Sequence, residues 1–119
     1  MQLYAIRGAT TVGSDSLDEI RCASVELIQA IVETNGIKPE ETVSLIATST
    51  SDIRAAYPVK FMRESGIIGD TPVFSACEPD IAGGLPLCIR VLWHIQKDDV
   101  DFKPKHVYLR GARTLITKN

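Results

Sequence analysis

The chain has 119 residues, of which 45% are apolar and 24% charged, and its formal net charge is −2. This length predicts one domain over residues 1–119, and the slightly acidic balance argues against nucleic acid or an anionic membrane as the main partner. No apolar stretch approaches the roughly 20 residues of a membrane span, and the N-terminus lacks the features of a signal peptide. We therefore expect a cytoplasmic protein with no membrane partner.

The first half of the chain predicts a strand, a helix and a second strand. Residues 2–13 indicate the first strand, and Ser16 begins a helix because the segment SLDE that it opens fits a capping box. An apolar stripe at helical period continues to Asn35-Gly36, a pair typical of a left-handed helix end. Residues 43–47 predict a short buried strand, and residues 48–52 a polar loop.

The second half predicts a short helix and three further strands. Pro58 suits the first position of a helix that ends near Gly66. Residues 71–75 and 87–96 indicate strands, and the second of these alternates between two kinds of face. Residues 106–109 indicate a last strand, which we expect residues 113–116 to extend. This order of elements predicts an α/β (α+β) fold with a mixed sheet packed by helices.

Four polar residues stand where apolar residues are expected. Arg7 ends the apolar run LYAI, Arg90 interrupts LCI and VLW, and Tyr108 lies inside HVYL, while Glu78 precedes a Gly-Gly pair. The alternation of residues 87–96 places Arg90 on the side opposite the fully apolar face. Burying a guanidinium without a partner costs several kcal/mol, so such a strand needs an anion to face it. The set predicts a pocket for a small, multiply charged anion.

No motif for a metal, nucleotide or covalent nucleophile is present, so we expect neither a metal nor a cofactor. Three cysteines without CxxC spacing, Cys22, Cys77 and Cys88, indicate buried, inert thiols rather than a disulfide framework. His94 and His106 have apolar neighbours and are interpreted as structural. What remains is electrostatic stabilisation. Each charged residue taken singly also suits a solvated surface, so the residues alone predict no more than an anion-binding α/β domain.

Four segments together resemble the AroH class of chorismate mutases. They are IRGATTV from Ile6, YPVK from Tyr57 with Arg63 beyond it, Glu78 followed by GGL and by CIRV around Arg90, and HVYL up to Leu109. The resemblance covers nearly the whole chain. It implies a homotrimer that forms a pseudo-α/β barrel with pockets at the subunit interfaces. It also implies a cofactor-free [3,3] rearrangement of the chorismate dianion to prephenate, on the path to phenylalanine and tyrosine.

The resemblance assigns roles to the four polar residues. Arg90 would face the ether oxygen whose C–O bond breaks, and Glu78 would accept a hydrogen bond from the ring hydroxyl near developing positive charge. Arg7 and Tyr108 would hold a carboxylate. The remaining implied substrate-binding residues are an aromatic wall, two cations from the neighbouring subunit, a backbone segment and one apolar side chain: Tyr57, Lys60 and Arg63, Phe74 and Ser75, and Leu115.

The chain departs from the family at its C-terminus. Many members have an arginine where this chain has Ile116, and here the chain ends in the polar residues 117–119. Arg113 and Lys118 are the candidates to replace that arginine at the mouth of the pocket.

Two other functions remain open from the sequence. A trimer like the reactive-intermediate deaminases would also grip a carboxylate with an arginine, but the Gln-rich C-terminal signature of that family is missing. A non-catalytic trimer that senses chorismate or prephenate needs only the carboxylate grips, Arg7 and Tyr108. The presence of Arg90 together with Glu78 favours the enzyme.

Overall fold

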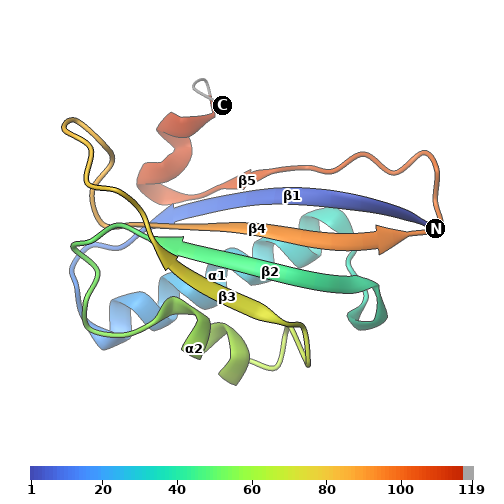
Figure 1. Cartoon of the computed structure of the whole chain (residues 1–119), viewed down its shortest axis with the longest axis horizontal. Coiled ribbons are helices and arrows are strands. Elements are labelled where there is room, and N and C mark those ends of the chain that lie inside the picture. The colour runs from blue at the N-terminus through green and yellow to red at the C-terminus, as the bar shows by residue number, and fades with distance from the viewer. Residues whose placement is uncertain (117–119) are drawn as a thin grey trace.

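The computed structural model describes residues 1–116 as one mixed sheet with α-helices on one of its faces (Figure 1). The sheet has five strands in the order β3-β2-β4-β1-β5. The elements are β1 (Gln2–Thr11), α1 (Leu17–Asn35), the 3-10 turn η1 (Pro39–Glu41), β2 (Thr42–Ser49), α2 (Pro58–Glu64), β3 (Val73–Cys77), β4 (Cys88–Lys97), β5 (Val107–Tyr108) and the 3-10 helix η2 (Arg110–Leu115). The predicted α/β (α+β) class with a mixed sheet is confirmed.

Strand pairing sets which residues are neighbours across the sheet. β4 runs antiparallel to both β1 and β2, and the two outer pairings, β2 with β3 and β1 with β5, are parallel. Ala9 and Thr48 lie opposite Arg90 on its two sides, and Tyr108 lies opposite Ala9. Because side chains in adjacent strands at paired positions share a face, these residues form one row across the sheet.

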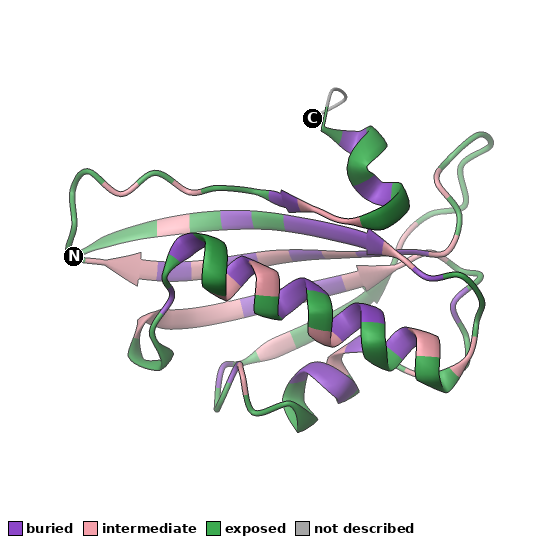
Figure 2. Ribbon diagram, turned by 180° about the vertical axis from the view of Figure 1, so that it is seen from behind, coloured by how far each residue is buried: buried purple, intermediate pink, exposed green. Residues whose placement is uncertain are grey.

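The core lies between the sheet and α1, which crosses in front of the sheet in Figure 2. Ser16 caps this helix by accepting a hydrogen bond from the backbone N–H of Glu19, and Gly36 ends it with φ 60°, as predicted. Ile20, Leu27, Ile28 and Ile31 of α1 are fully buried and belong to the same core cluster as Trp93. Gly8 allows the close approach, since a Cβ there would lie 2.6 Å from Cδ1 of Ile31.

The opposite face of the sheet carries no helix over most of its length. It presents Leu3 and Phe74, which are 65% and 77% exposed, together with half-buried Ile46 and Leu92. We call this the open face. Only η2 packs there, where Ala112 and Leu115 cover Ala9 at one end.

Two of the sequence-based predictions, a loop at residues 48–52 and a strand extension at residues 113–116, are wrong at positions that line or flank the open face. Residues 48–49 belong to β2 rather than to a loop, because β3 and β4 pair with them on both sides. Residues 113–116 do not extend a strand. Arg110 adopts φ 51°, which ends β5, and Gly111 then passes so close to Thr11 that a Cβ would lie 2.8 Å from its Oγ1. The chain turns there into η2. The other predicted elements differ from expectation only at their ends, and η1 was not predicted.

None of the helices formed by residues 1–116 combines the length and the apolar character needed to cross a membrane.

Candidate active site

A hollow of about 290 Å³ lies on the open face of the sheet, next to η2. Side chains from β1, β2 and β4 reach it because alternate residues of each strand point to that face. Its lining combines two guanidinium groups, a phenol, a hydroxyl and apolar surface: Arg7, Gly8, Ala9, Ile46, Thr48, Arg90, Val91, Leu92, Tyr108 and Leu115. The structure therefore brings together both predicted arginines, the predicted tyrosine and Leu115.

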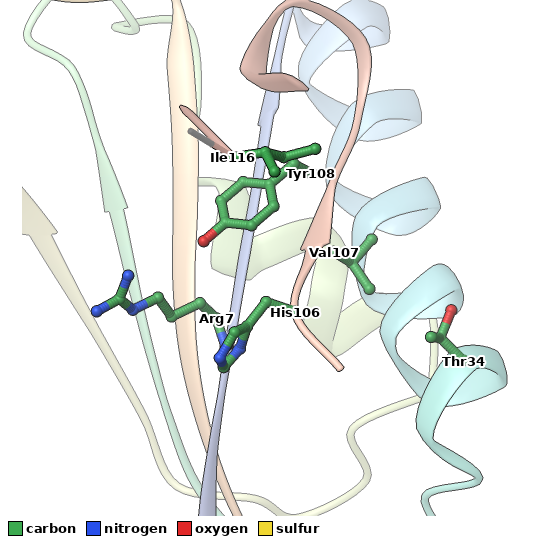
Figure 3. Close-up of a pocket in the computed structure, with 6 residues that line it drawn as sticks. All are labelled: Arg7, Thr34, His106, Val107, Tyr108 and Ile116. Atoms are coloured by element: carbon green, nitrogen blue, oxygen red, sulfur yellow. The ribbon is translucent and has the colours of Figure 1, made fainter. Parts of the chain in front are cut away.

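Arg7 and Tyr108 line the same hollow because β5 pairs with β1 in parallel. The guanidinium of Arg7 and the hydroxyl of Tyr108 extend to the same side of β1 (Figure 3). The backbone N–H of Arg7 donates to Nδ1 of His106 at 2.9 Å, which gives that histidine the structural contact expected of it. The sequence led us to expect a buried Arg7, but its side chain is exposed in the single chain. The reason is that η2 covers only the end of the open face.

Arg90 projects from β4, the middle strand of the sheet. Its side chain is 40% exposed, and Nε lies 3.3 Å from Oε2 of Glu78. The two groups form an ion pair by distance, yet the Nε–H is not aimed at the carboxylate. Among the described residues this buried Nε has no hydrogen-bond acceptor. A buried donor without a partner costs about 1–3 kcal/mol, so it indicates a place for an acceptor from outside the chain.

Glu78 directly follows β3 and stays attached to the sheet. Its backbone N–H donates to the carbonyl of Ser49 at 2.9 Å, which continues the parallel ladder of β2 and β3 by one bond. The side chain consequently points to the open face, as does that of Ala76. There Oε2 accepts a hydrogen bond from the hydroxyl of Thr48 at 2.6 Å. The carboxylate thus faces Arg90 across β2.

The cysteines supply no thiolate at this site. Cys88 shares the open-face side of β4 with Arg90 and is fully buried. Burial raises the pKa of the Cys88 thiol, and the nearby Arg90 guanidinium only partly offsets this effect. The group therefore stays a neutral thiol at pH 7. The expectation that all three cysteines are buried is wrong, because Cys22 lies on the outer face of α1 and Cys77 on the edge strand, and both are exposed.

The other predicted site residues lie elsewhere in the chain. Tyr57 and Ser75 line a second hollow of about 810 Å³, between the start of α2 and the edge strand β3. Phe74 alternates to the open face and is 77% exposed. A single chain thus divides the predicted set between two surfaces on opposite sides of β3.

The two basic residues of α2 have different surroundings. Lys60 is exposed, and its Nζ lies 3.8 Å from Glu64 on the same helix. Arg63 donates to the backbone carbonyls of Gly69 and Thr71, the latter at 2.6 Å. This guanidinium therefore holds the segment that follows α2, a role that the sequence did not indicate.

Two residues near the site were missed by the sequence analysis. Thr48 was assigned to a loop, although its spacing of two from Ile46 was a signal that both share one face of a strand. Asp52 accepts from the backbone N–H of Leu87, which adopts φ 49°, and from the hydroxyl of Thr50. These contacts fix the end of the segment that leads from Glu78 to β4.

Near the C-terminus, Ile116 is 58% exposed and lines a groove with Arg7, His106 and Tyr108 (Figure 3). Arg113 is exposed on η2. Lys118, the other candidate for a cation at the mouth, lies with residues 117–119 outside the described part of the chain.

The arrangement suits binding of a small dianion and stabilisation of charge within it. Two guanidinium groups and a phenol supply donors, and one carboxylate supplies an acceptor, all held on a sheet whose geometry is fixed before a ligand arrives. Within residues 1–116, no group of three or more His, Cys, Asp or Glu side chains is placed to hold a metal ion.

Comparison with known proteins gives a consistent result. The family model described as "Chorismate mutase type I" matches residues 3–118. "Chorismate mutase AroH" from Bacillus subtilis is 38% identical over 124 residues, which span 100% of this chain and 98% of that protein. "Chorismate mutase AroH" from Thermus thermophilus is 40% identical over 108 residues, which span 90% and 88% of the two chains.

A solved structure agrees with these relatives. A chorismate mutase from Clostridium thermocellum superposes with a TM-score of 0.87 at 39% identity, covering 94% of this chain and 99% of that one. Matches of this length and identity concern the whole domain rather than one motif. The chain therefore belongs to the type I chorismate mutase family.

Proposed function

We propose that this protein is an isomerase that converts chorismate to prephenate by a cofactor-free [3,3] rearrangement, in the synthesis of phenylalanine and tyrosine. Membership of the type I family supports the reaction. The observation that carries the proposal for this chain is the buried Nε–H of Arg90, which lacks an acceptor among the described residues and lines the hollow shared with Arg7 and Tyr108. An ether oxygen that gains negative charge is the acceptor this donor requires.

The reaction redistributes electrons within one molecule. The ether C–O bond breaks while a C–C bond forms, and in the transition state negative charge grows on the ether oxygen and positive charge on the ring. Arg90 stabilises the oxygen, and Glu78 accepts from the ring hydroxyl and lies near the positive charge. Arg7 and Tyr108 hold a carboxylate. Because no proton leaves the substrate, the site needs preorganised charges rather than a general base.

The proposed assembly is a homotrimer in which neighbouring chains complete each pocket. Three observations support it: the apolar open face, the division of the predicted residues between two surfaces, and the small first hollow. At about 290 Å³ this hollow is just below the roughly 300–1,000 Å³ typical of small-molecule sites. A neighbour that covers the open face would bury Phe74 and bring Tyr57, Lys60 and Ser75 to the substrate. Arg63 would line the mouth with those of its N–H donors that do not bind the backbone carbonyls of Gly69 and Thr71.

The purified protein tests the reaction directly. Incubation with chorismate, without added metal or cofactor and in the presence of EDTA, should abolish the diene absorbance and yield prephenate by chromatography. Chorismate binding without turnover would support the sensor function instead, and loss of activity on dialysis that an added metal restores would refute the mechanism. Family membership does not favour the deaminase-like alternative. The proposed compartment is the cytoplasm, which three unpaired cysteines support.

Sedimentation tests the assembly. A trimer at the concentration of the assay is expected, and a fully active monomer would contradict the shared pocket.

A further inference from the structure

Glu78 would point in no fixed direction without a second contact. Its carboxylate sits at the end of a flexible side chain on a residue just beyond a strand. Fixing such a side chain costs about 1.5–2 kcal/mol of rotamer entropy. Arg90 alone does not fix it, because its Nε lies 3.3 Å from Oε2 but the N–H does not point along a hydrogen bond to that oxygen.

Thr48 supplies the missing contact. Its hydroxyl donates to Oε2 of Glu78 at 2.6 Å, the short distance typical of a hydrogen bond to an ionised carboxylate. The donor is itself rigid. β2 is paired on both sides at this position, with Ala76 and with Arg90, and a β-branched side chain has few χ1 choices.

We propose that Thr48 is a positioning residue that holds the Glu78 carboxylate in the orientation used by the reaction. The hydrogen bond engages Oε2 on the side of β2 and leaves Oε1 to accept from the ring hydroxyl of the substrate. It also gives the negative charge of Glu78 a donor other than Arg90, so that the Nε–H of Arg90 stays available for the ether oxygen. This role rests on the proposed function.

Two substitutions separate the hydroxyl from the shape of the side chain. Thr48→Val keeps the branched shape and removes the donor, whereas Thr48→Ser keeps the donor and removes a methyl group. We expect Thr48→Val to lower kcat about tenfold, the lower end of what a hydrogen bond to a charged group is worth. KM should change less, because Arg7 and Tyr108 remain. Thr48→Ser should stay within about twofold of the parent. Thermal melts check folding, and Thr48→Ala replaces Thr48→Val where the latter does not fold.

A double-mutant cycle tests whether Thr48 acts through Glu78. In a Glu78→Ala background, Thr48→Val should cause no further loss of kcat, and a crystal structure of Thr48→Val should show the Glu78 carboxylate displaced from its place opposite Arg90. Equal losses in Thr48→Val and Thr48→Ser, or an undiminished loss in the Glu78→Ala background, would assign Thr48 to packing and overturn the proposal.

The parent protein is assayed first. A parent that does not convert chorismate refutes the proposed function and with it this role, whereas an active parent with an equally active, folded Thr48→Val variant refutes the role alone.

Discussion

Replacement of Arg90 is the sharpest test of how this site works. Arg90 projects from the central strand, so its guanidinium is held before substrate arrives, and its buried Nε–H has no acceptor among the residues described. Loss of one preorganised donor of this kind lowers kcat by about 10²–10³, or roughly 3 kcal/mol. We therefore expect Arg90→Ala to lower kcat by at least this factor.

A second effect of Arg90→Ala falls on binding. With the guanidinium gone, the negative charge of Glu78 on the open face is compensated only by the hydrogen bond from Thr48. A dianionic substrate is then repelled, so KM should rise as well. In the double variant Arg90→Ala/Glu78→Ala, KM should return part of the way to the parent value, whereas kcat should stay as low as in Arg90→Ala. Arg90→Lys should resemble Arg90→Ala in kcat, because an ammonium does not reproduce the planar donors of a guanidinium.

Steady-state kinetics of chorismate loss, with sedimentation to verify assembly, measures both effects. A correctly assembled Arg90→Ala protein whose kcat stays within a few-fold of the parent would show that Arg90 does not stabilise the transition state. A loss confined to KM would make it a ground-state anchor.

Three further predictions concern the surroundings of the site. Glu78→Gln should fold like the parent and lose part of kcat, because the amide keeps an acceptor but not the charge; activity equal to the parent in both Glu78→Gln and Glu78→Ala would leave Glu78 without a role. Hydrogen bonds from the Thr50 hydroxyl and, to a smaller extent, from the Leu87 N–H lower the pKa of Asp52 in the folded state. These hydrogen bonds therefore stabilise the folded state above the ordinary aspartate pKa, and the stabilisation is lost as the pH falls through the lowered pKa. Asp52→Asn should therefore melt below the parent at neutral pH and match it in acid, and a pH-independent difference would argue against this linkage. Ile116→Arg should lower KM, more so at low salt, with kcat unchanged, and a KM that does not respond to salt would place position 116 away from the substrate.

Local patterns predicted those parts of the site that depend on one strand at a time. The alternation of residues 87–96 was sufficient to place Arg90 on the face opposite the apolar core, and the capping signals placed both ends of α1. Each of these inferences needs only the period of one element.

Pairing between strands that are distant in the chain could not be predicted from the sequence. The contact of Thr48 with Glu78 depends on the parallel register of β2 and β3, which no local pattern specifies. The turn into η2 depends on the left-handed backbone of Arg110, a conformation that the residue type itself disfavours. The backbone contacts of Arg63 likewise follow from where the chain after α2 happens to pass.

The order of strands also determines when the charged site comes into existence during synthesis. β1 is made first, but both of its neighbours, β4 and β5, come from the last third of the chain. Until then β1 can pack only on the nearby α1, and long-range pairing of this kind is the slow part of folding. Arg7 is therefore without Arg90 and Tyr108 beside it until most of the chain has been translated. A chain that ends before β4 contains Arg7 but neither Arg90 nor Tyr108, and it therefore cannot form the anion-binding site.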